Sequence, residues 1–272
     1  MFIEALIVLF ALGFSAGITY LIPKGFGYDY FAPFLLLIAG YLIGMGLAWA
    51  LLYIVSLPYS KKKDYSKPKK LATFWLTEAL WYINHHARIK LIIKNNVALP
   101  KERYLLVCNH RSKFDPMIIA QLYGKKQLAF ISKPTNFKIP LGGKFMKASC
   151  YLSIDRYDKL KSLEVMKQAS DYIANDLTSI GVFPEGTRSE TNELQAFHEG
   201  VFSIALKTNC PIVITSIKGT ENIHKNFPKR KTVVEFEILE ILYPEDYKGM
   251  IAKEVSDHAY QLIYNSLQEQ SN

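Results

Sequence analysis

Two long apolar blocks near the N-terminus restrict the fold of this chain more than any other feature of its sequence. The first runs from Phe2 to Ile22, with Glu4 as its one ionisable residue, and the second runs from Phe31 to Leu57 without a charged residue. A helix of about 20 residues crosses the roughly 30 Å hydrocarbon core of a bilayer, so each block is long enough to span one. We therefore predict a transmembrane hairpin of two helices within residues 1–60.

Two alternatives apply to these blocks. A cleaved signal peptide would carry Lys or Arg before its apolar run and small residues at a cleavage site, and the first block shows neither clearly. One or both segments could also lie in the membrane interface. The hairpin is favoured because a second apolar block follows at once, after the short link Pro23–Tyr30. Each block also contains a pair of small residues that allows close helix packing in lipid, Gly13 with Gly17 and Gly40 with Gly44.

The basic charge of the chain is concentrated beside the second block. The net charge is +9, and six lysines follow the block closely: Lys61, Lys62, Lys63, Lys67, Lys69 and Lys70. The positive-inside rule places such a cluster in the cytoplasm, so we expect a cell-membrane protein whose larger domain is cytoplasmic. Lysines near an anionic leaflet contribute about 1 kcal/mol each, which predicts anionic membrane lipids as partners. Nucleic acid is a poorer candidate because no nucleic-acid motif accompanies the charge.

The cysteines argue against a metal or disulfide framework. The chain has three, without a C-x-x-C pair: Cys108, Cys150 and Cys210. An odd number at wide spacing suggests neither a zinc site nor a set of disulfides. We expect reduced core residues in a cytosolic domain and no metal site.

Residues 61–272 divide into a connecting region and a domain. Residues 61–88 are predicted to be a basic linker and an interfacial helix rich in Trp and Tyr, although a buried first helix of the domain fits this helix nearly as well. In residues 89–272 strands and helices alternate, which predicts an α/β domain with a mostly parallel sheet flanked by helices. The expected strands are Ile89–Ile93, Tyr104–Cys108, Leu128–Ser132, Ile180–Phe183, Pro211–Ile217 and Val233–Ile241. The expected helices are Met117–Tyr123, Leu160–Leu177, Val201–Lys207 and Glu254–Leu267.

The polar segment Asn109–Pro116 follows an apolar strand directly and contains a histidine and an aspartate. Sites in parallel α/β sheets lie beyond the carboxyl ends of the strands, which is where His110 falls. Histidine is suited to take a proton near neutral pH, and Asp115 could orient its ring and support the imidazolium. The alternative is that Asp115 only caps the following helix, with Pro116 at its first position.

Two further polar segments follow predicted strands. The first, Phe183–Ser189, places a carboxylate, a turn glycine, two hydroxyls and an arginine within seven residues. Arginine presents a planar fork that suits phosphate oxygens, and Gly186 permits positive φ and a close approach of the backbone. The second is Ile154-Asp155-Arg156, which offers another cation. A surface turn with a Glu–Arg pair is the alternative for the first segment.

Taken together, the order and spacing of these segments resemble the glycerolipid acyltransferase family, and in particular the PlsC-type 1-acylglycerol-3-phosphate acyltransferases. The resemblance covers about Leu105 to Thr220. Four blocks carry it: His110-x4-Asp115, Ile154-Asp155-Arg156, Phe183-Pro184-Glu185-Gly186-Thr187-Arg188 and Pro211-Ile212-Val213. It implies that residues 89–272 are an acyltransferase domain that moves a fatty acyl chain from acyl-CoA or acyl-carrier protein to the sn-2 hydroxyl of lysophosphatidic acid, forming phosphatidic acid.

The resemblance also implies roles for individual residues. His110 is the general base, and Asp115 orients it. The residues expected at the acceptor phosphate are Arg156, Glu185, Gly186, Thr187 and Arg188. Candidates with less defined roles are Asn109, Arg111, Ser112 and, from its position after a strand alone, Lys133. The reaction requires no cofactor or metal beyond the acyl donor.

The sequence departs from the family pattern at three positions: Cys150 and Ser153 in the second block and Ile214 in the fourth. The departures leave the proposed catalytic pair intact, so they bear on the choice of acceptor. Another lysophospholipid or hydroxyl lipid is therefore an alternative acceptor. A hydrolase is disfavoured because no G-x-S-x-G elbow is present. A non-catalytic lipid-binding protein would be expected to have lost His110 or Asp115.

Overall fold

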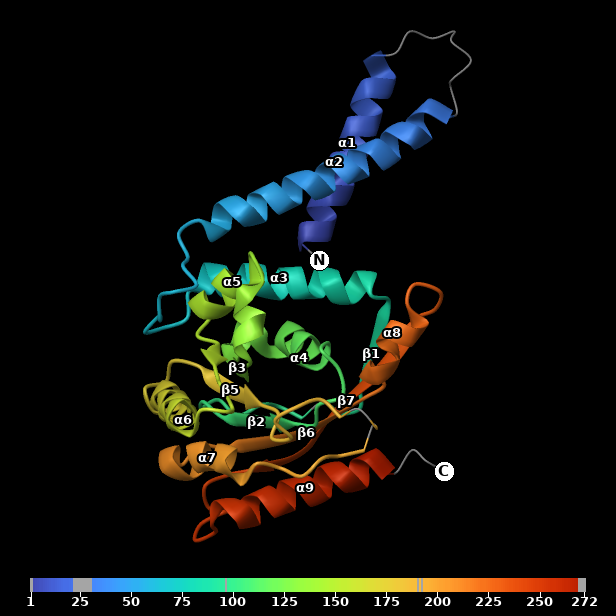
Figure 1. Ribbon diagram of the computed structural model, residues 1–272. Coiled ribbons are helices and arrows are strands. Elements are labelled where there is room, and N and C mark those ends of the chain that lie inside the picture. The colour runs from blue at the N-terminus through green and yellow to red at the C-terminus, as the bar shows by residue number, and fades with distance from the viewer. Residues whose placement is uncertain (1, 22–30, 96, 190, 192, 269–272) are drawn as a thin grey trace. The chain divides into compact units, whose positions relative to one another are not determined.

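The computed structural model describes residues 2–21, 31–95, 97–189, 191 and 193–268 (Figure 1). The chain forms two compact units, Met1–Ser60 and Lys61–Asn272. The predicted link Pro23–Tyr30 lies outside the described residues.

The N-terminal unit consists of two helices, α1 (Phe2–Leu21) and α2 (Phe31–Ser56). Both are long and apolar enough to cross a membrane by length and composition. Gly40 and Gly44 of α2 face α1: a Cβ on Gly40 would lie 3.0 Å from Cα of Ala11, and one on Gly44 would lie 3.3 Å from the carbonyl oxygen of Ile7. The pair on α1 differs, because among the described residues no atom beyond the backbone of α1 itself lies within 4 Å of the Cβ positions of Gly13 and Gly17. Close packing therefore uses the glycines of one helix only.

The second unit is built on a seven-stranded sheet with the order β1-β7-β6-β2-β5-β3-β4. Strands β2 to β6 run parallel to one another, β7 is antiparallel to β6, and β1 is parallel to β7. Its strands are β1 (Ile89–Ile93), β2 (Leu105–Cys108), β3 (Leu128–Ser132), β4 (Leu152–Ser153), β5 (Ser179–Val182), β6 (Ile212–Lys218) and β7 (Thr232–Leu242). The central strands β2 and β5 are buried along their whole length, as expected for parallel strands covered on both faces.

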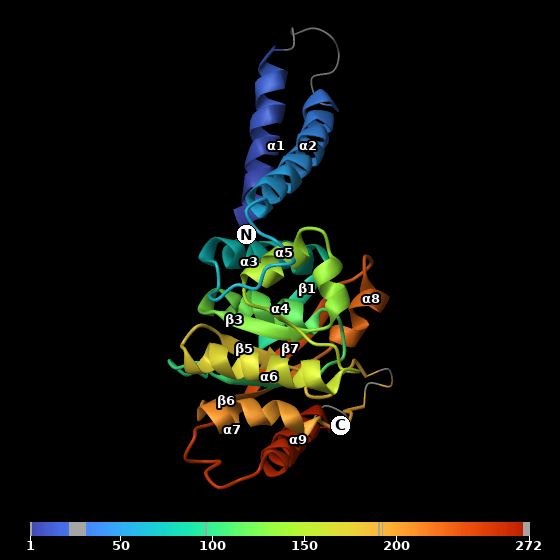
Figure 2. The same ribbon diagram turned by 60° about the vertical axis from the view of Figure 1, so that its left-hand side comes forward.

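Helices cover both faces of this sheet (Figures 1 and 2). Helices α3, α4 and α5 lie on one face, whereas α6, α7 and α9 lie on the other. Their bounds are α3 (Lys70–His86), α4 (Asp115–Tyr123), α5 (Gly142–Ala148), α6 (Lys159–Ala174), α7 (Ser203–Thr208), α8 (Ile223–Asn226) and α9 (Ala252–Gln268), with short 3-10 turns η1 (Gly124–Lys126), η2 (Pro134–Lys138), η3 (Glu199–Phe202) and η4 (Thr220–Asn222). The predicted α/β class with a mostly parallel sheet is confirmed.

Three local features differ from the expected pattern. Strand β7 turns back beside β6, because the segment between them contains only η4 and the four-residue α8 in place of a full crossover helix. Helix α6, predicted over Leu160–Leu177, is buried only in its second half: Leu160 and Leu163 are 75% and 65% exposed, while Ala169 and Ile173 are buried. Helix α5 was not predicted.

Helix α3 packs within the second unit. It contacts α4 and α5 and buries Trp75, Leu76 and Asn84, and it leaves Leu71 and Ile83 exposed. That its exposed face lies on a bilayer stays a prediction.

The directions of the strands bring the polar segments of the sequence to one edge of the sheet. Because β2, β3, β4, β5 and β6 are parallel, the residues that follow their last positions share the same edge. Those residues begin at Asn109, Lys133, Ile154, Phe183 and Gly219. The candidate site is built at this edge.

Candidate active site

The buried carboxylate of Asp115 organises the loop after β2. It is 0% exposed, and its Oδ2 accepts three hydrogen bonds: from Nδ1 of His110 at 2.9 Å, from the backbone N–H of Arg111 at 2.7 Å and from that of Ser112 at 2.6 Å. Asp115 is the first residue of α4, which has no side-chain cap. The carboxylate therefore reaches back to the loop, and the alternative of a helix cap alone does not describe it.

The ring of His110 is held on two sides. Asp115 bonds to Nδ1, and the ring of Phe183 stacks on the imidazole with centroids 4.3 Å apart. A carboxylate at Nδ1 selects the tautomer with the proton on that nitrogen, which leaves Nε2 as the basic atom. The side chain is 16% exposed, so solvent or a substrate can reach it. This arrangement can accept a proton from a hydroxyl group.

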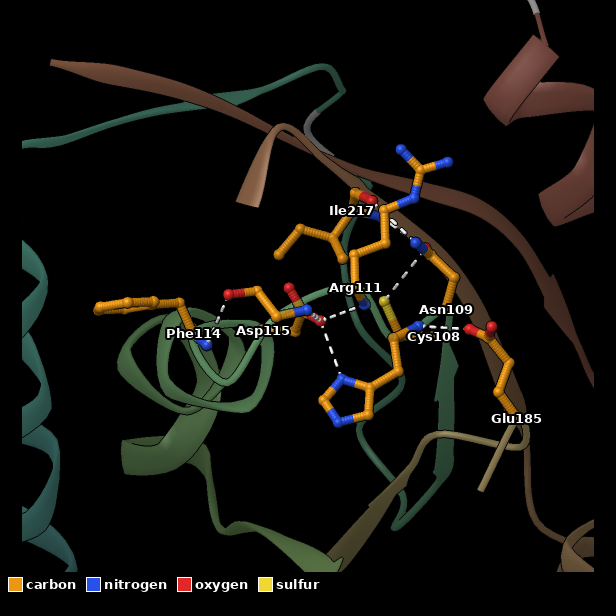
Figure 3. A network of polar contacts seen from close by, with 9 residues as sticks. Cys108, Asn109, Arg111, Phe114, Asp115, Glu185 and Ile217 are labelled. Atoms are coloured by element: carbon orange, nitrogen blue, oxygen red, sulfur yellow. Dashed lines mark hydrogen bonds and ion pairs between the residues drawn. The ribbon is translucent and has the colours of Figure 1, made fainter. Parts of the chain in front are cut away.

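The loop after β5 closes against the loop after β2 through Glu185. Its side chain is 3% exposed, Oε1 accepts the backbone N–H of His110 at 2.5 Å and Oε2 accepts that of Gln195 at 3.0 Å. Figure 3 shows Asp115 and Glu185 on opposite sides of the segment that carries Arg111. Burial raises the pKa of Glu185, and the two backbone N–H donors act in the opposite direction. The backbone N–H of Ser189 completes the closure by donating to the carbonyl of His110 at 3.0 Å.

A glycine, an arginine and a second histidine meet in the same loop region. Gly186 has φ of 72°, a conformation that favours glycine. A Cβ there would lie 2.8 Å from Nε2 of His198 and 4.0 Å from Nη1 of Arg156. The two nitrogens are therefore no more than about 7 Å apart, the sum of these two distances, so one phosphate group could contact both through different oxygens. Burial lowers the pKa of Arg156.

The remaining predicted residues divide by exposure and contact. Arg188 and Thr187 are exposed beyond Gly186, and Lys133 is exposed after β3. In the part of the chain that the structure describes, no hydrogen bond or ion pair joins Lys133 or Arg188 to His110, Asp115 or Glu185. The edge thus has a buried part around His110 and an exposed cationic part.

Asn109, Arg111 and Ser112 have structural partners. The amide of Asn109 pairs with the backbone of Ile217, donating to its C=O and accepting from its N–H, each at 2.9 Å, and so joins β2 to β6. The guanidinium of Arg111 lies 3.5 Å from Glu221, which follows β6. The hydroxyl of Ser112 accepts the N–H of Phe114, and its side chain is buried. This hydroxyl is engaged in the turn, which disfavours a serine hydrolase.

Sequence reasoning missed several residues of the site. Phe183 was noted only as part of a motif, and nothing in its spacing indicated that its ring stacks on His110. Gln195 contributes only a backbone N–H, which has no signal in the sequence. His198 lies ten residues beyond Arg188, and its exposed position in a loop gave no reason to select it. Among the described residues, no group of three or more His, Cys, Asp or Glu could hold a metal ion.

The chain is similar in sequence to known acyltransferases. The acyltransferase family model matches residues 88–218. A 1-acyl-sn-glycerol-3-phosphate acyltransferase of Chlamydomonas reinhardtii is 30% identical over 162 residues, which cover 58% of this chain and 48% of the relative. A protein of the same description from Cocos nucifera is 34% identical over 118 residues, covering 43% of this chain and 38% of the relative. The chain thus spans less than half the length of either relative.

The fold has a match among solved structures. The crystal structure of the 1-acyl-sn-glycerophosphate acyltransferase PlsC from Thermotoga maritima superposes with a TM-score of 0.60, covering 74% of this chain and 80% of that one, at 23% sequence identity. At this identity the likeness shows a shared fold. The family resemblance indicated by the four sequence blocks is confirmed by the family model, which matches residues 88–218 as an acyltransferase domain.

Proposed function

We propose that the chain is a membrane-bound O-acyltransferase that moves a fatty acyl group from a thioester donor to the sn-2 hydroxyl of 1-acyl-sn-glycerol-3-phosphate, forming phosphatidic acid. The observation that carries this proposal is the hydrogen bond between His110 and the fully buried Asp115, at the same sheet edge as the cations. The descriptions of the relatives support the acceptor, since they are named for this activity.

The proton path follows from the tautomer of His110. Nε2 takes the proton of the acceptor hydroxyl as the hydroxyl oxygen attacks the carbonyl carbon of the thioester. The imidazolium is stabilised by the carboxylate of Asp115. When the tetrahedral intermediate collapses, the C–S bond breaks and the leaving thiolate takes the proton from Nε2. The products are the ester and a free thiol, and His110 returns to its starting state.

Binding of the acceptor is assigned to the exposed cationic part of the edge. Arg156 and Arg188 offer charge, while Gly186 leaves room for a phosphate to approach the backbone and Thr187 offers a hydroxyl. Lys133 is a further candidate because it follows β3 at the same edge.

Membrane attachment is assigned to the N-terminal unit. Helices α1 and α2 are long and apolar enough to span a bilayer, and lysines follow α2. By the positive-inside rule the domain lies on the cytoplasmic side of the cell membrane, where anionic lipids would attract these lysines. An anchored enzyme meets an amphiphilic acceptor at high effective concentration. A tag between α1 and α2 should then be accessible to protease only from outside the cell.

The test is acyl transfer by the full chain purified in detergent. Lysophosphatidic acid is offered with acyl-CoA and with acyl-carrier protein, and lysophosphatidylcholine serves as a second acceptor. The matched variants are His110→Ala and His258→Ala, the latter on α9 in a pair with Glu240. We expect phosphatidic acid from the wild type and from His258→Ala, and none from His110→Ala. Activity in folded His110→Ala, or no transfer to either acceptor with either donor, would overturn the proposal.

A further inference from the structure

The carboxylate of Glu185 is buried against the backbone of two loop segments. It is 3% exposed, and each of its two oxygens accepts a backbone N–H, one from His110 and one from Gln195. A carboxylate carries the same sign of charge as a phosphate and donates no hydrogen bond while ionised. Its neighbour Gly186, by contrast, borders the nitrogens of Arg156 and His198.

We propose that Glu185 is a positioning residue for the general base and does not contact the acceptor phosphate. This inference rests on the proposed function of His110. It separates two tasks within one short segment: Glu185 faces the base, and the residues after it face the acceptor. The motif resemblance alone had grouped all of them at the phosphate.

The two hydrogen bonds that Glu185 accepts from the backbone N–H groups of His110 and Gln195, here called the clasp, act in part on the main chain of His110. Both backbone groups of this residue bond to the β5 loop, its N–H to the carboxylate of Glu185 and its C=O to the N–H of Ser189. The same loop supplies the ring of Phe183 that stacks on the imidazole. Asp115 restrains only Nδ1 and the next two backbone N–H groups. The position of the ring along the sheet edge therefore depends on Glu185, and not on Asp115 alone.

The second oxygen extends the clasp to a more distant part of the loop. Gln195 lies ten residues after Glu185, and its N–H is fixed by Oε2. Three residues further on, the N–H of His198 donates to the carbonyl of Pro184 at 2.8 Å. One buried carboxylate thus holds the base and the return of the loop that carries His198. Loss of the clasp should release both segments together.

A conservative substitution separates the two roles of Glu185. In Glu185→Gln the side chain keeps its size, but an amide has one oxygen and one NH2 group, so one of the two N–H donors faces another donor. A shift of the base by about 1 Å costs on the order of 10²-fold in rate. We expect kcat of the full chain to fall by about that factor, with the KM for lysophosphatidic acid nearly unchanged. Arg188→Ala, measured alongside, should mainly raise that KM.

Amide hydrogen exchange followed by mass spectrometry gives a readout that needs no activity. In Glu185→Gln, peptides that contain His110 and Gln195 should both exchange faster than in the wild type, while a peptide from α9 serves as the internal control. Glu185→Asp keeps the charge on a shorter side chain and should release one of the two peptides more than the other, even if the glutamine variant folds poorly. Because exchange tests the clasp alone, a failure of the proposed reaction would be seen separately, in the wild-type assay.

Two results would overturn the inference. The first is Glu185→Gln with near-normal kcat and an acceptor KM raised tenfold or more, which is the behaviour of a phosphate contact. The second is unchanged exchange at both His110 and Gln195 in a folded variant.

Discussion

Replacement of Asp115 by asparagine removes one charge from the site and changes its shape little. In the wild type, Oδ2 accepts three N–H groups, whereas Oδ1 is buried without a partner among the described residues. In Asp115→Asn the amide oxygen is expected to keep the place of Oδ2, since the NH2 group there would face three donors. The NH2 group then takes the place of Oδ1, where a buried donor without a partner destabilises the fold by about 1–3 kcal/mol.

The effect on catalysis follows from the distance between the ring and the carboxylate. A hydrogen bond to a charged group contributes up to about 3 kcal/mol net. Two unit charges 2.9 Å apart attract by about 6 kcal/mol at an effective dielectric constant of ~20. The attraction is present only when His110 is protonated, so its loss lowers kcat. At about 1.4 kcal/mol per tenfold change, we expect kcat to fall by roughly 10²- to 10⁴-fold.

The assay is steady-state formation of phosphatidic acid at saturating donor and acceptor. A thermal unfolding scan of the same preparation is the control, because the fold must persist for kcat to be interpreted. A folded Asp115→Asn variant with kcat within tenfold of the wild type would refute the reasoning, since the carboxylate would then contribute little to the imidazolium.

Substitution of Asn109, substitution of Gly186 and chemical modification of the cysteines test three further features of the structure. Asn109→Ala removes the side chain that pairs with the backbone N–H and C=O of Ile217, so the free energy of unfolding should fall by about 2–5 kcal/mol. Denaturant titration measures this fall, and the KM for the acceptor should be unchanged in the folded fraction. Gly186→Ala places a methyl group 2.7 Å from the ring of His198, at a residue whose backbone is left-handed. The substitution should raise the KM for the acceptor at least tenfold, and an unaltered KM would show that this loop does not contact the acceptor. Burial raises the pKa of the thiols of Cys108, Cys150 and Cys210, in the case of Cys150 to about 11, so all three stay protonated at pH 8. A thiol reagent at that pH should therefore modify none of them in the native protein and all of them after denaturation.

Much of the fold could be predicted from the sequence because its signals are local and periodic. The apolar blocks at Phe2 and Phe31 differ from the rest of the chain in length and lack of charge, and both became helices near the expected bounds. The strands Leu105–Cys108 and Ser179–Val182 are short apolar runs followed by polar loops, and both lie in the centre of the sheet. Placement of the motifs at one edge followed from parallel pairing alone.

The features that could not be predicted depend on tertiary contacts. The sequence predicted a helix over Leu160–Leu177, but it could not show that Leu160 and Leu163 are exposed, because their exposure depends on which elements pack against the helix. The reversal at β7 depends on how the segment after β6 packs, since strand patterns do not encode direction. Within the site, the inward orientation of Glu185 is set by backbone N–H groups from two distant segments. Such donors are present at every residue except proline, so the sequence gives no sign of which ones are used.

The dependence on peptide donors affects how freely the site can change over evolutionary time. Arg111, Ser112, Ser189 and Gln195 each donate through the main chain, and that donor is the same whatever side chain the residue carries. As backbone donors, these positions tolerate any residue type except proline, which has no N–H group. Asp115 and Glu185, which accept three of these four N–H groups, have no such latitude, because each accepts through a buried side-chain carboxylate. A relative with 30% identity could thus retain the same constellation while nearly every residue that donates to it has been replaced.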